Sequence, residues 1–572
     1  MNKKILFLQK KGNKETLFLQ KIGKKYLTFC LLLVIVFIGG FLRMYSLEKS
    51  HPSLNWDEAS WGYNAYSVMQ SGKDEYNKPF PIFTRAFDEY KSTVPLYLMI
   101  PSIKIFGLNE VGVRFPSAFI GTLLIIVVFL ITRYYFGKIP ALFASLFFAI
   151  EPWSVHLSRV YMDAIMALFF MLSGLLLFEY SKKKNWLFPL SFLSIIISIY
   201  TYNANKIVAP LLIFLLLFLN WKFVKGLNKK YLISAILISA VLLLIFGYLG
   251  LKGEAFARVK YTSILSLWPS EGKSLSGSHD LPGLFDFIVH NPYFYFFWDV
   301  AGRYLGYFSP MNLFVRESTD SALVLSGNSI FHLFEFFLWV VGLVWLFYNF
   351  KNKKEIFFLM LLAPIPAIAT WSWFHPGRVM TLLAIYSILI GVGAAFVYEK
   401  LSMLSKKYLK KSYYSFVFIL IIIGISTSSV FYLYDSIFVY LPLKDSGNWQ
   451  PGIRETSYAI KDLYDNYDQV IIESSHANAY IFFLLYMNYP PQRYLNELDY
   501  SKLTSPRKHY DFGKFKFRNI YWPEDKYLKR TLLVGSEAAL KEEYISKQPN
   551  SKILKDIKDS KGNFIARLVE IN

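Results

Sequence analysis

Two adjacent carboxylates, Asp57 and Glu58, follow Trp56 in the run LNWDEASWGYNAYSVMQSG. Apolar residues recur at helical spacing from Glu58 to Gln70, so we expect a helix lying along a membrane surface. Near the start of a helix, a carboxylate can cap backbone N–H groups. At a boundary between water and lipid, it can instead act as a general base for an acceptor hydroxyl or amine. Both interpretations of Asp57 stay open at this point.

A second acidic pair, Asp88 and Glu89, precedes Tyr90 and Lys91 in the run FDEYKSTVPLYLMIPSIKIFG. The apolar residues after Lys91 predict a second interfacial helix. A lysine at headgroup depth can extend its ammonium to water along an apolar surface. It can also bind a lipid phosphate.

Further polar side chains stand in or beside the short turns 154–160, 202–206 and 372–378. In the first, Arg159 and Asp163 are four residues apart, so on one helix they would share a face and pair. An ionisable residue that enters an apolar span is also a functional hypothesis by default. The other two turns supply Tyr202, Lys206, His375 and Arg378.

These residues alternate with long apolar runs in a chain of 572 residues. Apolar side chains make up 54% of the chain and charged ones only 18%. This composition excludes a disordered protein and argues against a soluble enzyme. Since about 20 apolar residues cross a bilayer, we expect a polytopic α-helical membrane protein of about eleven spans. The predicted spans are 28–47, 115–135, 139–153, 161–180, 186–201, 207–221, 231–251, 331–349, 355–371, 379–398 and 413–434.

The distribution of Lys and Arg predicts the orientation. The segments on the N-terminal side of the membrane carry 25 of these residues, and the short turns on the other side carry three. By the positive-inside rule, the N-terminus is cytoplasmic and the C-terminal tail lies outside the plasma membrane. The outward cations Lys91, Arg159, Lys206 and Arg378 then indicate an anionic ligand at the outer leaflet.

We expect three parts along the chain: a basic cytoplasmic segment 1–25, a transmembrane domain 26–435, and an outer domain 436–572. Two outer loops, 48–114 and 252–330, are too long to be simple connectors. In the tail, YDQVIIES, RTLLVGS and FIARLVEIN read as strands, and NAYIFFLLYMN and EAALKEEYISK read as helices. This mixture predicts a small α/β domain that covers or positions the site rather than catalysing.

Several motifs resemble the GT-C superfamily of polytopic glycosyltransferases, in particular the bacterial protein O-mannosyltransferase and lipid A aminoarabinose transferase group. The most specific block runs from residue 55 to 122 and includes NWDE, FDEYKSTVPLYLMIPSIKIFG and NEVGVRFPSAFIGTL. SRVYMD, YTYNANK, FSPMNLF and HPGR follow in the same order. One departure is KSTVP, where the aminoarabinose transferases have lysine followed directly by two prolines.

The resemblance implies an inverting transferase that takes a sugar from a polyprenyl-phosphate donor at the outer face. Asp57 matches the catalytic base, with Glu58 beside it, and Lys91 matches the residue that contacts the donor phosphate. Arg159, Lys206 and Arg378 are the further cations expected at that phosphate. The expected substrate contacts are Asp88, Glu89, Tyr90, Asp163, Tyr202 and His375.

The chemistry of the leaving group supports the same assignment. A glycosyl phosphodiester releases a phosphate monoester, and cations stabilise the negative charge that this group gains. One base without a second, nucleophilic carboxylate predicts inversion at the anomeric carbon. No cofactor is expected, and a divalent metal stays open without being indicated. The partners would be the lipid-linked donor, membrane lipids and a protein, glycolipid or polysaccharide acceptor; neither the sugar nor the acceptor follows from the residues.

Three alternatives remain. A transporter or flippase of polyprenyl lipids would place charges at broken helices and show two similar halves, neither of which the sequence indicates. A surface-polysaccharide ligase or polymerase would concentrate its chemistry in one large later loop. A non-catalytic scaffold would only carry the outer domain.

Overall fold

The computed structural model describes most of the chain, except for the N-terminal segment and much of the loop 252–330. It describes residues 26–87, 89–254, 263, 292–317, 323–325, 327–370, 372–409, 413–444, 446–473, 479–498 and 510–572. Asp88, the predicted basic segment 1–25 and most of the predicted loop 252–330 therefore lie outside the described residues.

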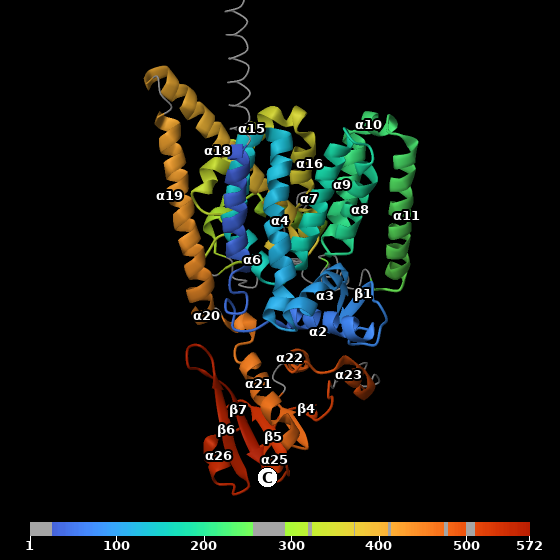
Figure 1. Ribbon diagram of the computed structural model, residues 1–572, viewed down its shortest axis with the longest axis vertical. Coiled ribbons are helices and arrows are strands. Elements are labelled where there is room, and N and C mark those ends of the chain that lie inside the picture. The colour runs from blue at the N-terminus through green and yellow to red at the C-terminus, as the bar shows by residue number, and fades with distance from the viewer. Residues whose placement is uncertain are drawn as a thin grey trace, which may run out of the picture.

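A bundle of helices forms the larger part of the molecule (Figure 1). The long apolar runs fold as helices, because in a helix all backbone N–H and C=O groups form their hydrogen bonds within the segment. The bundle begins with the helix Tyr26–Met44 and contains α4 (Glu110–Phe136), α5 (Lys138–Ile150), α6 (Pro152–Arg159), α7 (Asp163–Ser181), α8 (Leu187–Ile199), α9 (Asn205–Leu219), α10 (Trp221–Lys225), α11 (Lys229–Leu251), α14 (Pro292–Gly306), α15 (Glu335–Asn349), α16 (Lys354–Leu362), α17 (Ile365–Ile368), α18 (Met380–Leu409), α19 (Tyr413–Asp435) and α20 (Leu441–Lys444).

The predicted polytopic helical architecture is confirmed, since each of the eleven predicted segments contains a helix. Among the described residues, six helices are long and apolar enough to cross a membrane, or seven if the bent pair α5 and α6 counts as one span. Shorter apolar helices such as α8 and α9 lie within the same bundle. The number of spans stays a prediction.

The two ends of the bundle differ in what they carry. In Figure 1, α10 and the junction of α18 with α19 lie at one end, and the segment 48–114 with the C-terminal domain lies at the other. This arrangement agrees with the predicted alternation of short basic loops and long polar segments. Which end faces the cytoplasm stays a prediction.

Small residues let the central helix α18 approach its neighbours closely. A Cβ atom added at Gly342 of α15 would lie 2.0 Å from the Leu389 carbonyl oxygen, and one at Gly393 would lie 1.9 Å from the Leu338 oxygen. On the other side, a Cβ at Gly391 would meet the backbone of Ala144 in α5. Close backbone packing of this kind holds helices together where lipid removes the hydrophobic driving force.

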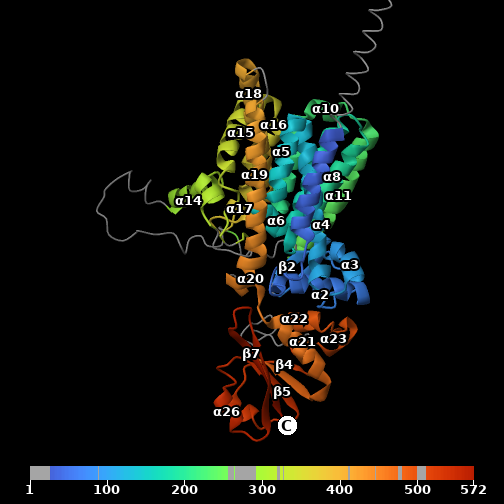
Figure 2. The ribbon, with the colours of Figure 1, turned by 60° about the vertical axis from the view of Figure 1, so that its left-hand side comes forward.

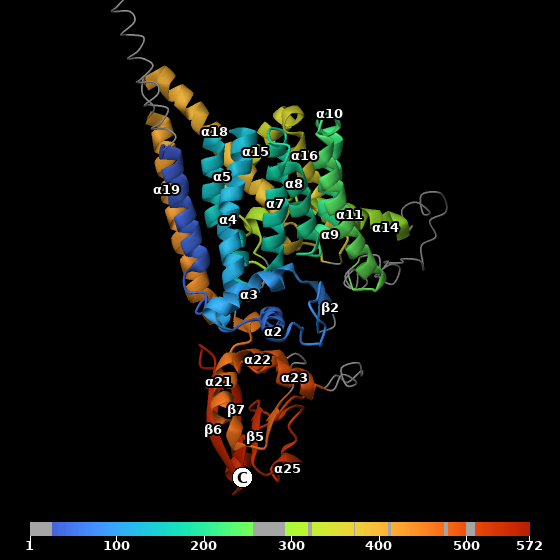
Figure 3. The same ribbon diagram turned by 45° about the vertical axis from the view of Figure 1, so that its right-hand side comes forward.

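The segment 48–114 folds against one end of the bundle, where Figure 3 shows it between the helices and the C-terminal domain. It contains α2 (Trp56–Ser71), β1 (Phe83–Ala86), β2 (Glu89–Ser92) and α3 (Val94–Phe106). Both predicted interfacial helices are present. The antiparallel hairpin of β1 and β2, in which Thr84 faces Lys91, was not expected from the sequence.

The C-terminal domain is a small mixed sheet flanked by helices (Figure 2). The strand order is β4-β3-β5-β7-β6, with β3 parallel to β4 and β5, and β7 antiparallel to β5 and β6. Its elements are α21 (Ile453–Leu463), β3 (Gln469–Ile472), α22 (Tyr480–Tyr486), α23 (Pro491–Glu497), β4 (Phe515–Phe517), α25 (Trp522–Asp525), β5 (Thr531–Gly535), α26 (Glu542–Ser546), β6 (Ser551–Lys558) and β7 (Phe564–Ile571).

The predicted small α/β domain is therefore confirmed, with β3, β5, β7 and α22 where the sequence placed them. Strands β4 and β6 were not predicted. The helical run from α19 continues through Lys444 rather than ending before residue 436. Its length follows from the apolar residues 437–443, which extend the hydrophobic segment.

The C-terminal domain packs on α2 and on the start of α4. The Tyr486 hydroxyl donates to Glu110 at 3.0 Å and lies 2.9 Å from the Ser53 hydroxyl. Arg454 of α21 donates to the same Glu110 carboxylate at 3.2 Å. The Tyr63 hydroxyl of α2 donates to the Tyr489 carbonyl at 3.2 Å. Helix α2 therefore lies between the bundle and the C-terminal domain and is held from both sides.

Replacement of Gly342 by alanine is expected to force α15 away from α18, because the new Cβ would meet a backbone carbonyl that cannot move alone. Overpacking of this kind costs about 1–3 kcal/mol. Thermal unfolding of the detergent-solubilised protein measures the effect. Gly247→Ala in α11 is the control, since nothing lies within 4 Å of that position. Equal melting temperatures for the two variants would contradict the close crossing.

Candidate active site

The first turn of α2 is fixed by its own capping residues. The Asn55 side chain accepts a hydrogen bond from the Glu58 N–H at 2.8 Å, and Glu58 Oε2 accepts one from the Asn55 N–H at 3.0 Å. This reciprocal capping box satisfies two N–H groups at the helix end. Asn55 and Glu58 thus do the capping, and Asp57 lies in the first turn beside them.

Glu58 is completely buried and ties α2 to two other parts of the bundle. Its carboxylate receives Arg114 Nε at 2.8 Å and Arg114 Nη2 at 2.9 Å, which is a two-point contact. The backbone N–H of Tyr161 donates to the same carboxylate at 2.9 Å. Both oxygens are therefore engaged within the protein, and the geometry indicates that Glu58 holds the site rather than contacting a substrate.

Asp57 and Lys91, which were predicted as base and phosphate contact, form an ion pair. The Asp57 side chain is 54% exposed and the Lys91 side chain only 9%. The Lys91 ammonium also lies 5.4 Å from the centre of the Trp61 ring and 6.0 Å from that of Phe87. A mostly buried cation therefore meets an accessible carboxylate at the edge of α2.

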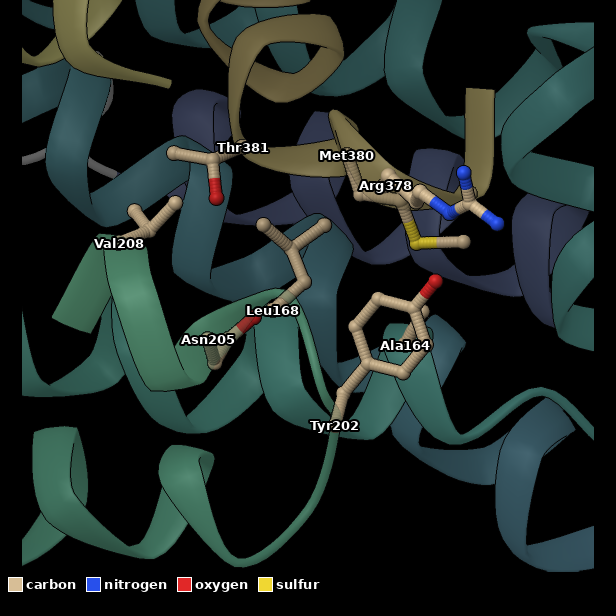
Figure 4. Close-up of a pocket in the computed structure, with 9 residues that line it drawn as sticks. Ala164, Leu168, Tyr202, Asn205, Val208, Arg378, Met380 and Thr381 are labelled. Carbon is tan, nitrogen blue, oxygen red and sulfur yellow. The ribbon is translucent and has the colours of Figure 1, made fainter. Parts of the chain in front are cut away.

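A small pocket brings together residues from α7, from α9 and the turn before it, and from α18 and the turn before it. Figure 4 shows the Tyr202 hydroxyl pointing toward the side of the pocket where Arg378 and Met380 lie. The Arg378 guanidinium donates to the Thr370 and Ser372 hydroxyls, which hold it in place. The pocket residues are Ala164, Leu168, Tyr202, Asn205, Val208, Gly377, Arg378, Met380 and Thr381. Two of the predicted site residues, Tyr202 and Arg378, thus share one pocket.

The β1–β2 hairpin joins this region to the ion pair. Lys206 donates to the Asn203 side chain at 2.6 Å, and its ammonium lies 5.0 Å from the centre of the Phe83 ring in β1. The Val94 N–H, just after β2, donates to the Tyr200 carbonyl at 3.3 Å. The turn that carries Tyr202 and Lys206 therefore packs on the hairpin that carries Lys91.

Arg159 occupies a different place from the other predicted cations. It is completely buried, and its guanidinium donates to the backbone carbonyls of Leu42 at 2.7 Å and Tyr45 at 2.8 Å. It thus holds the end of the first described helix. The expected shared helix face with Asp163 is wrong, because α6 ends at Arg159 and α7 begins at Asp163. Extended backbone at Val160 separates the two helices.

The remaining predicted residues are spread around these groups. Glu89 and Tyr90 lie in β2 and are half-buried, and Tyr90 packs against the small cluster of Phe83, Ile196 and Tyr200. The backbone N–H of His375, just before the 3-10 turn Pro376–Arg378, donates to the Tyr307 hydroxyl at 3.1 Å. Asp88 lies outside the described residues. Within the described part of the chain, no group of three or more His, Cys, Asp or Glu side chains is placed to hold a metal ion.

Sequence reasoning missed two buried acids inside the bundle. Glu151 lies at the break between α5 and α6, where the helix bends by 55°. It accepts a hydrogen bond from Ser387 of α18 at 2.6 Å. Glu335 begins α15 and accepts one from the His332 N–H at 2.9 Å. The acid at the bend between α5 and α6 was not noted from the sequence, and an acidic residue within an apolar run is the signal that would have marked both.

Part of the sequence matches the model of a known protein family. The family model described as dolichyl-phosphate-mannose-protein mannosyltransferase matches residues 91–246, from Lys91 to α11. No curated protein matches the sequence at a significant level.

Several solved structures resemble the chain. The archaeal oligosaccharyltransferase AglB from Archaeoglobus fulgidus, in complex with an inhibitory peptide and a dolichol-phosphate, matches with a TM-score of 0.51 and 15% identity, over 95% of this chain and 74% of that one. The apo form of the A. fulgidus oligosaccharyltransferase matches with a TM-score of 0.49 and 17% identity, over 81% of this chain and 64% of that one. ArnT from Cupriavidus metallidurans, bound to undecaprenyl phosphate, matches with a TM-score of 0.49 and 12% identity, over 96% and 98%.

The chain thus spans 64% of the length of the apo oligosaccharyltransferase and 74% of that of AglB in the complex, and the likeness to AglB is one of fold. The arrangement of helices agrees with the fold that the motifs predicted, and the segment that the family model matches includes several of those motifs. The fold is of the GT-C type, as in AglB, and residues 91–246 match the family model of the dolichyl-phosphate-mannose-protein mannosyltransferases.

Proposed function

We propose that this protein is an integral-membrane glycosyltransferase, which moves a sugar from a polyprenyl-phosphate donor to an acceptor at the outer face of the plasma membrane. The observation that carries the proposal is the contact between Asp57, an accessible carboxylate, and Lys91, a mostly buried ammonium. A base and a cation side by side are what a transfer from a glycosyl phosphate requires.

The comparisons support this proposal in two ways. The family model that covers residues 91–246 describes enzymes that use a dolichyl-phosphate-linked sugar. The AglB complex, which shares the fold, contains a dolichol-phosphate. The proposed donor class for this chain rests on both together with the charges at the site.

In the proposed reaction, an acceptor hydroxyl or amine attacks the anomeric carbon of the sugar. A bond from the acceptor atom to that carbon forms as the bond from the carbon to the phosphate oxygen breaks. The acceptor proton passes to Asp57, and the bonding electrons leave with the polyprenyl phosphate. One displacement with a single base inverts the anomeric configuration.

Lys91 and Arg378 are the proposed contacts of the phosphate, with Lys206 nearby on the hairpin side. The leaving phosphate gains negative charge, and fixed cations stabilise it most where water is excluded. Trp61 and Phe87 exclude water on one side of Lys91. Tyr202, beside Arg378, is proposed to contact the sugar or the phosphate.

The ion pair also bears on when Asp57 can act. With no donor bound, Lys91 and Asp57 neutralise each other, which weakens Asp57 as a base. A donor phosphate offers Lys91 a stronger anionic partner. We propose that Lys91 turns to the phosphate and so releases the Asp57 carboxylate for the acceptor.

The exchange of Asp57 for asparagine is expected to lower transfer by about 10²–10⁴-fold, because the base is lost. Because Lys91 is mostly buried and loses its partner, thermal unfolding of the variant is measured as well, and transfer is compared per amount of folded protein. Mass analysis of surface glycans and surface proteins, in cells that carry either form or neither, measures the transfer. Full transfer by Asp57→Asn would exclude the assigned base.

Glu58→Gln is expected to behave in the opposite way. It leaves the Arg114 charge buried without its partner, which costs about 3–5 kcal/mol of stability. Thermal unfolding measures this loss. Glu455→Gln is the control, because Glu455 pairs with Arg454 in a partly exposed surface ion pair, whose loss costs little stability. A Glu58→Gln variant as stable as the control would contradict the holding role.

Lys91→Met is expected to weaken binding of undecaprenyl phosphate by about 10²-fold, because a charge-assisted contact to the phosphate is lost. The dissociation constant is measured on the purified protein in detergent. Lys104→Met, on the exposed last turn of α3, removes the same charge away from the site and should leave binding unchanged. Equal binding by the two variants would exclude Lys91 as the phosphate contact.

A further inference from the structure

A second acid, Glu75, lies behind the ion pair and belongs to neither the base nor the phosphate contacts. It follows α2 in the turn after Gly72 and is 1% exposed. The Asn64 side chain of α2 donates to Glu75 Oε1 at 2.8 Å, and the Glu75 N–H donates back to Asn64 at 2.9 Å. The Tyr480 hydroxyl of α22 donates to Glu75 Oε2 at 2.9 Å. One carboxyl group thus ties α2 to the C-terminal domain.

Aromatic rings enclose this carboxyl group. The Tyr480 ring stacks on Tyr510 with ring centres 4.0 Å apart and an angle of 3°. The Tyr63 ring of α2 meets Tyr494 edge to face at 5.9 Å. The enclosure keeps water from Glu75, so a charge there acts on its neighbours with little screening.

Lys91 lies on the other side of the same aromatic group. Its ammonium stands 6.0 Å from the centre of the Phe87 ring, and that ring meets Tyr480 edge to face at 6.3 Å. The positive charge of Lys91 lowers the pKa of Glu75, although less than the hydrogen bonds from Asn64 and Tyr480 do. Lys91 therefore has two acidic neighbours, with Asp57 in direct contact and Glu75 behind.

Glu75 changes its charge near neutral pH. Burial raises the pKa of Glu75 to about 7, against the hydrogen bonds from Asn64 and Tyr480, which favour the ionised form. The titratable and charged groups around it are Asp74, Lys91, Tyr63, Tyr76, Tyr480, Tyr494 and Tyr510, with Arg85 beyond Tyr76. Among these, Asp74 opposes the ionised form and Lys91 favours it.

We propose that Glu75 is a positioning residue for the transfer: its carboxylate draws Lys91 away from Asp57, and Tyr480 of the C-terminal domain holds that carboxylate ionised. The proposal rests on the proposed function, since it assigns Asp57 as the base. When Glu75 is protonated, Lys91 has Asp57 as its nearer anion and neutralises it. When Glu75 is ionised, the two acids share Lys91, and Asp57 accepts the acceptor proton more readily. The C-terminal domain thereby takes part in catalysis without touching the substrate.

The first experiment needs no substrate and measures the thermal stability of the full chain in detergent from pH 5 to 8. Because the pKa of Glu75 is raised in the folded protein, the folded state holds this proton after the unfolded chain has lost it. Stability contributed by the proton is present below the ordinary carboxyl pKa and falls as pH rises toward about 7. Glu75→Gln removes this dependence. The melting temperature of the variant should therefore rise relative to that of the wild type between pH 5 and 7.5. A difference in melting temperature that stays constant from pH 5 to 8 would contradict the titration of Glu75 in this range.

The second experiment measures the initial rate of transfer against pH in membrane vesicles, using the product that the comparison of surface glycans identifies. The wild-type rate at pH 6 should be about tenfold below its plateau, as expected for a group with a pKa near 7. In Glu75→Gln this acid limb should be absent and the rate at pH 8 about tenfold lower than in the wild type. Glu75→Gln with an unchanged acid limb would overturn the proposal.

The matched pair Tyr480→Phe and Tyr486→Phe separates positioning from simple docking. Both remove one hydroxyl of α22 that donates to a buried glutamate, Glu75 in the first case and Glu110 in the second. Tyr480→Phe should raise the midpoint of the acid limb by about one pH unit, because the ionised carboxylate loses a donor. Tyr486→Phe should lower stability and leave the midpoint unchanged.

Equal midpoints for the two tyrosine variants would overturn the role of Tyr480. Two outcomes separate the proposed function from the positioning role. If the surface glycans and surface proteins are the same with and without the protein, the proposed function fails, and if Asp57→Asn keeps full transfer, the assigned base fails. If Asp57→Asn loses transfer but the Glu75 and Tyr480 variants keep the wild-type pH profile, only the positioning role fails.

Discussion

The contact between Asp57 and Lys91 is the interaction on which the rest of the site depends. Lys91 is nearly buried between Trp61 and Phe87, so its charge is poorly screened and needs an anion. Asp57 supplies that anion while keeping half of its side chain exposed. A phosphate that binds beside such a cation forms a strong ionic contact with it. A carboxylate that loses its cation becomes a stronger base. Both proposed steps thus follow from one pair of charges.

The surrounding structure fixes the positions of Asp57 and Lys91 relative to each other. Helix α2 starts at a fixed point because Asn55 and Glu58 cap it, and the buried pair of Glu58 with Arg114 fastens that start to α4. Lys91 comes from β2, whose pairing with β1 sets its direction. The C-terminal domain closes the back of α2 through the tyrosines of α22 and of the turn that follows it. The base therefore stands on an element that is clamped from two sides.

The residues of the site could be predicted from the sequence better than their surroundings. Asp57 and Lys91 stand in one polar segment next to apolar runs, and both their residue types and their motifs marked them. The hairpin between them was not predicted, because FTRA and EYKS are four residues each and lack a clear alternation of apolar side chains. Arg159 and Glu58 show a second limit. Sequence marks a charge near a span end but not its partners, which lie far along the chain: Leu42 is 117 residues from Arg159, and Arg114 is 56 residues from Glu58.

The helical architecture followed from hydropathy because lipid allows few alternatives to a helix. Its finer details did not, since Ser387, which donates a hydrogen bond to Glu151 at the break, lies on a helix far along the chain. The most specific part of the resemblance, from residue 55 to 122, overlaps the segment that the family model matches. The later motifs, in the turns around Tyr202 and Arg378, meet in one pocket of the folded chain. Their short lengths gave no hint of that convergence.

A structure determined with undecaprenyl phosphate bound tests the central claim most directly. The account predicts that the Lys91 ammonium lies within hydrogen-bonding distance of a phosphate oxygen and has left the Asp57 carboxylate, which then faces open space beside the phosphate. A phosphate bound elsewhere, with Lys91 and Asp57 still in contact, would contradict the account.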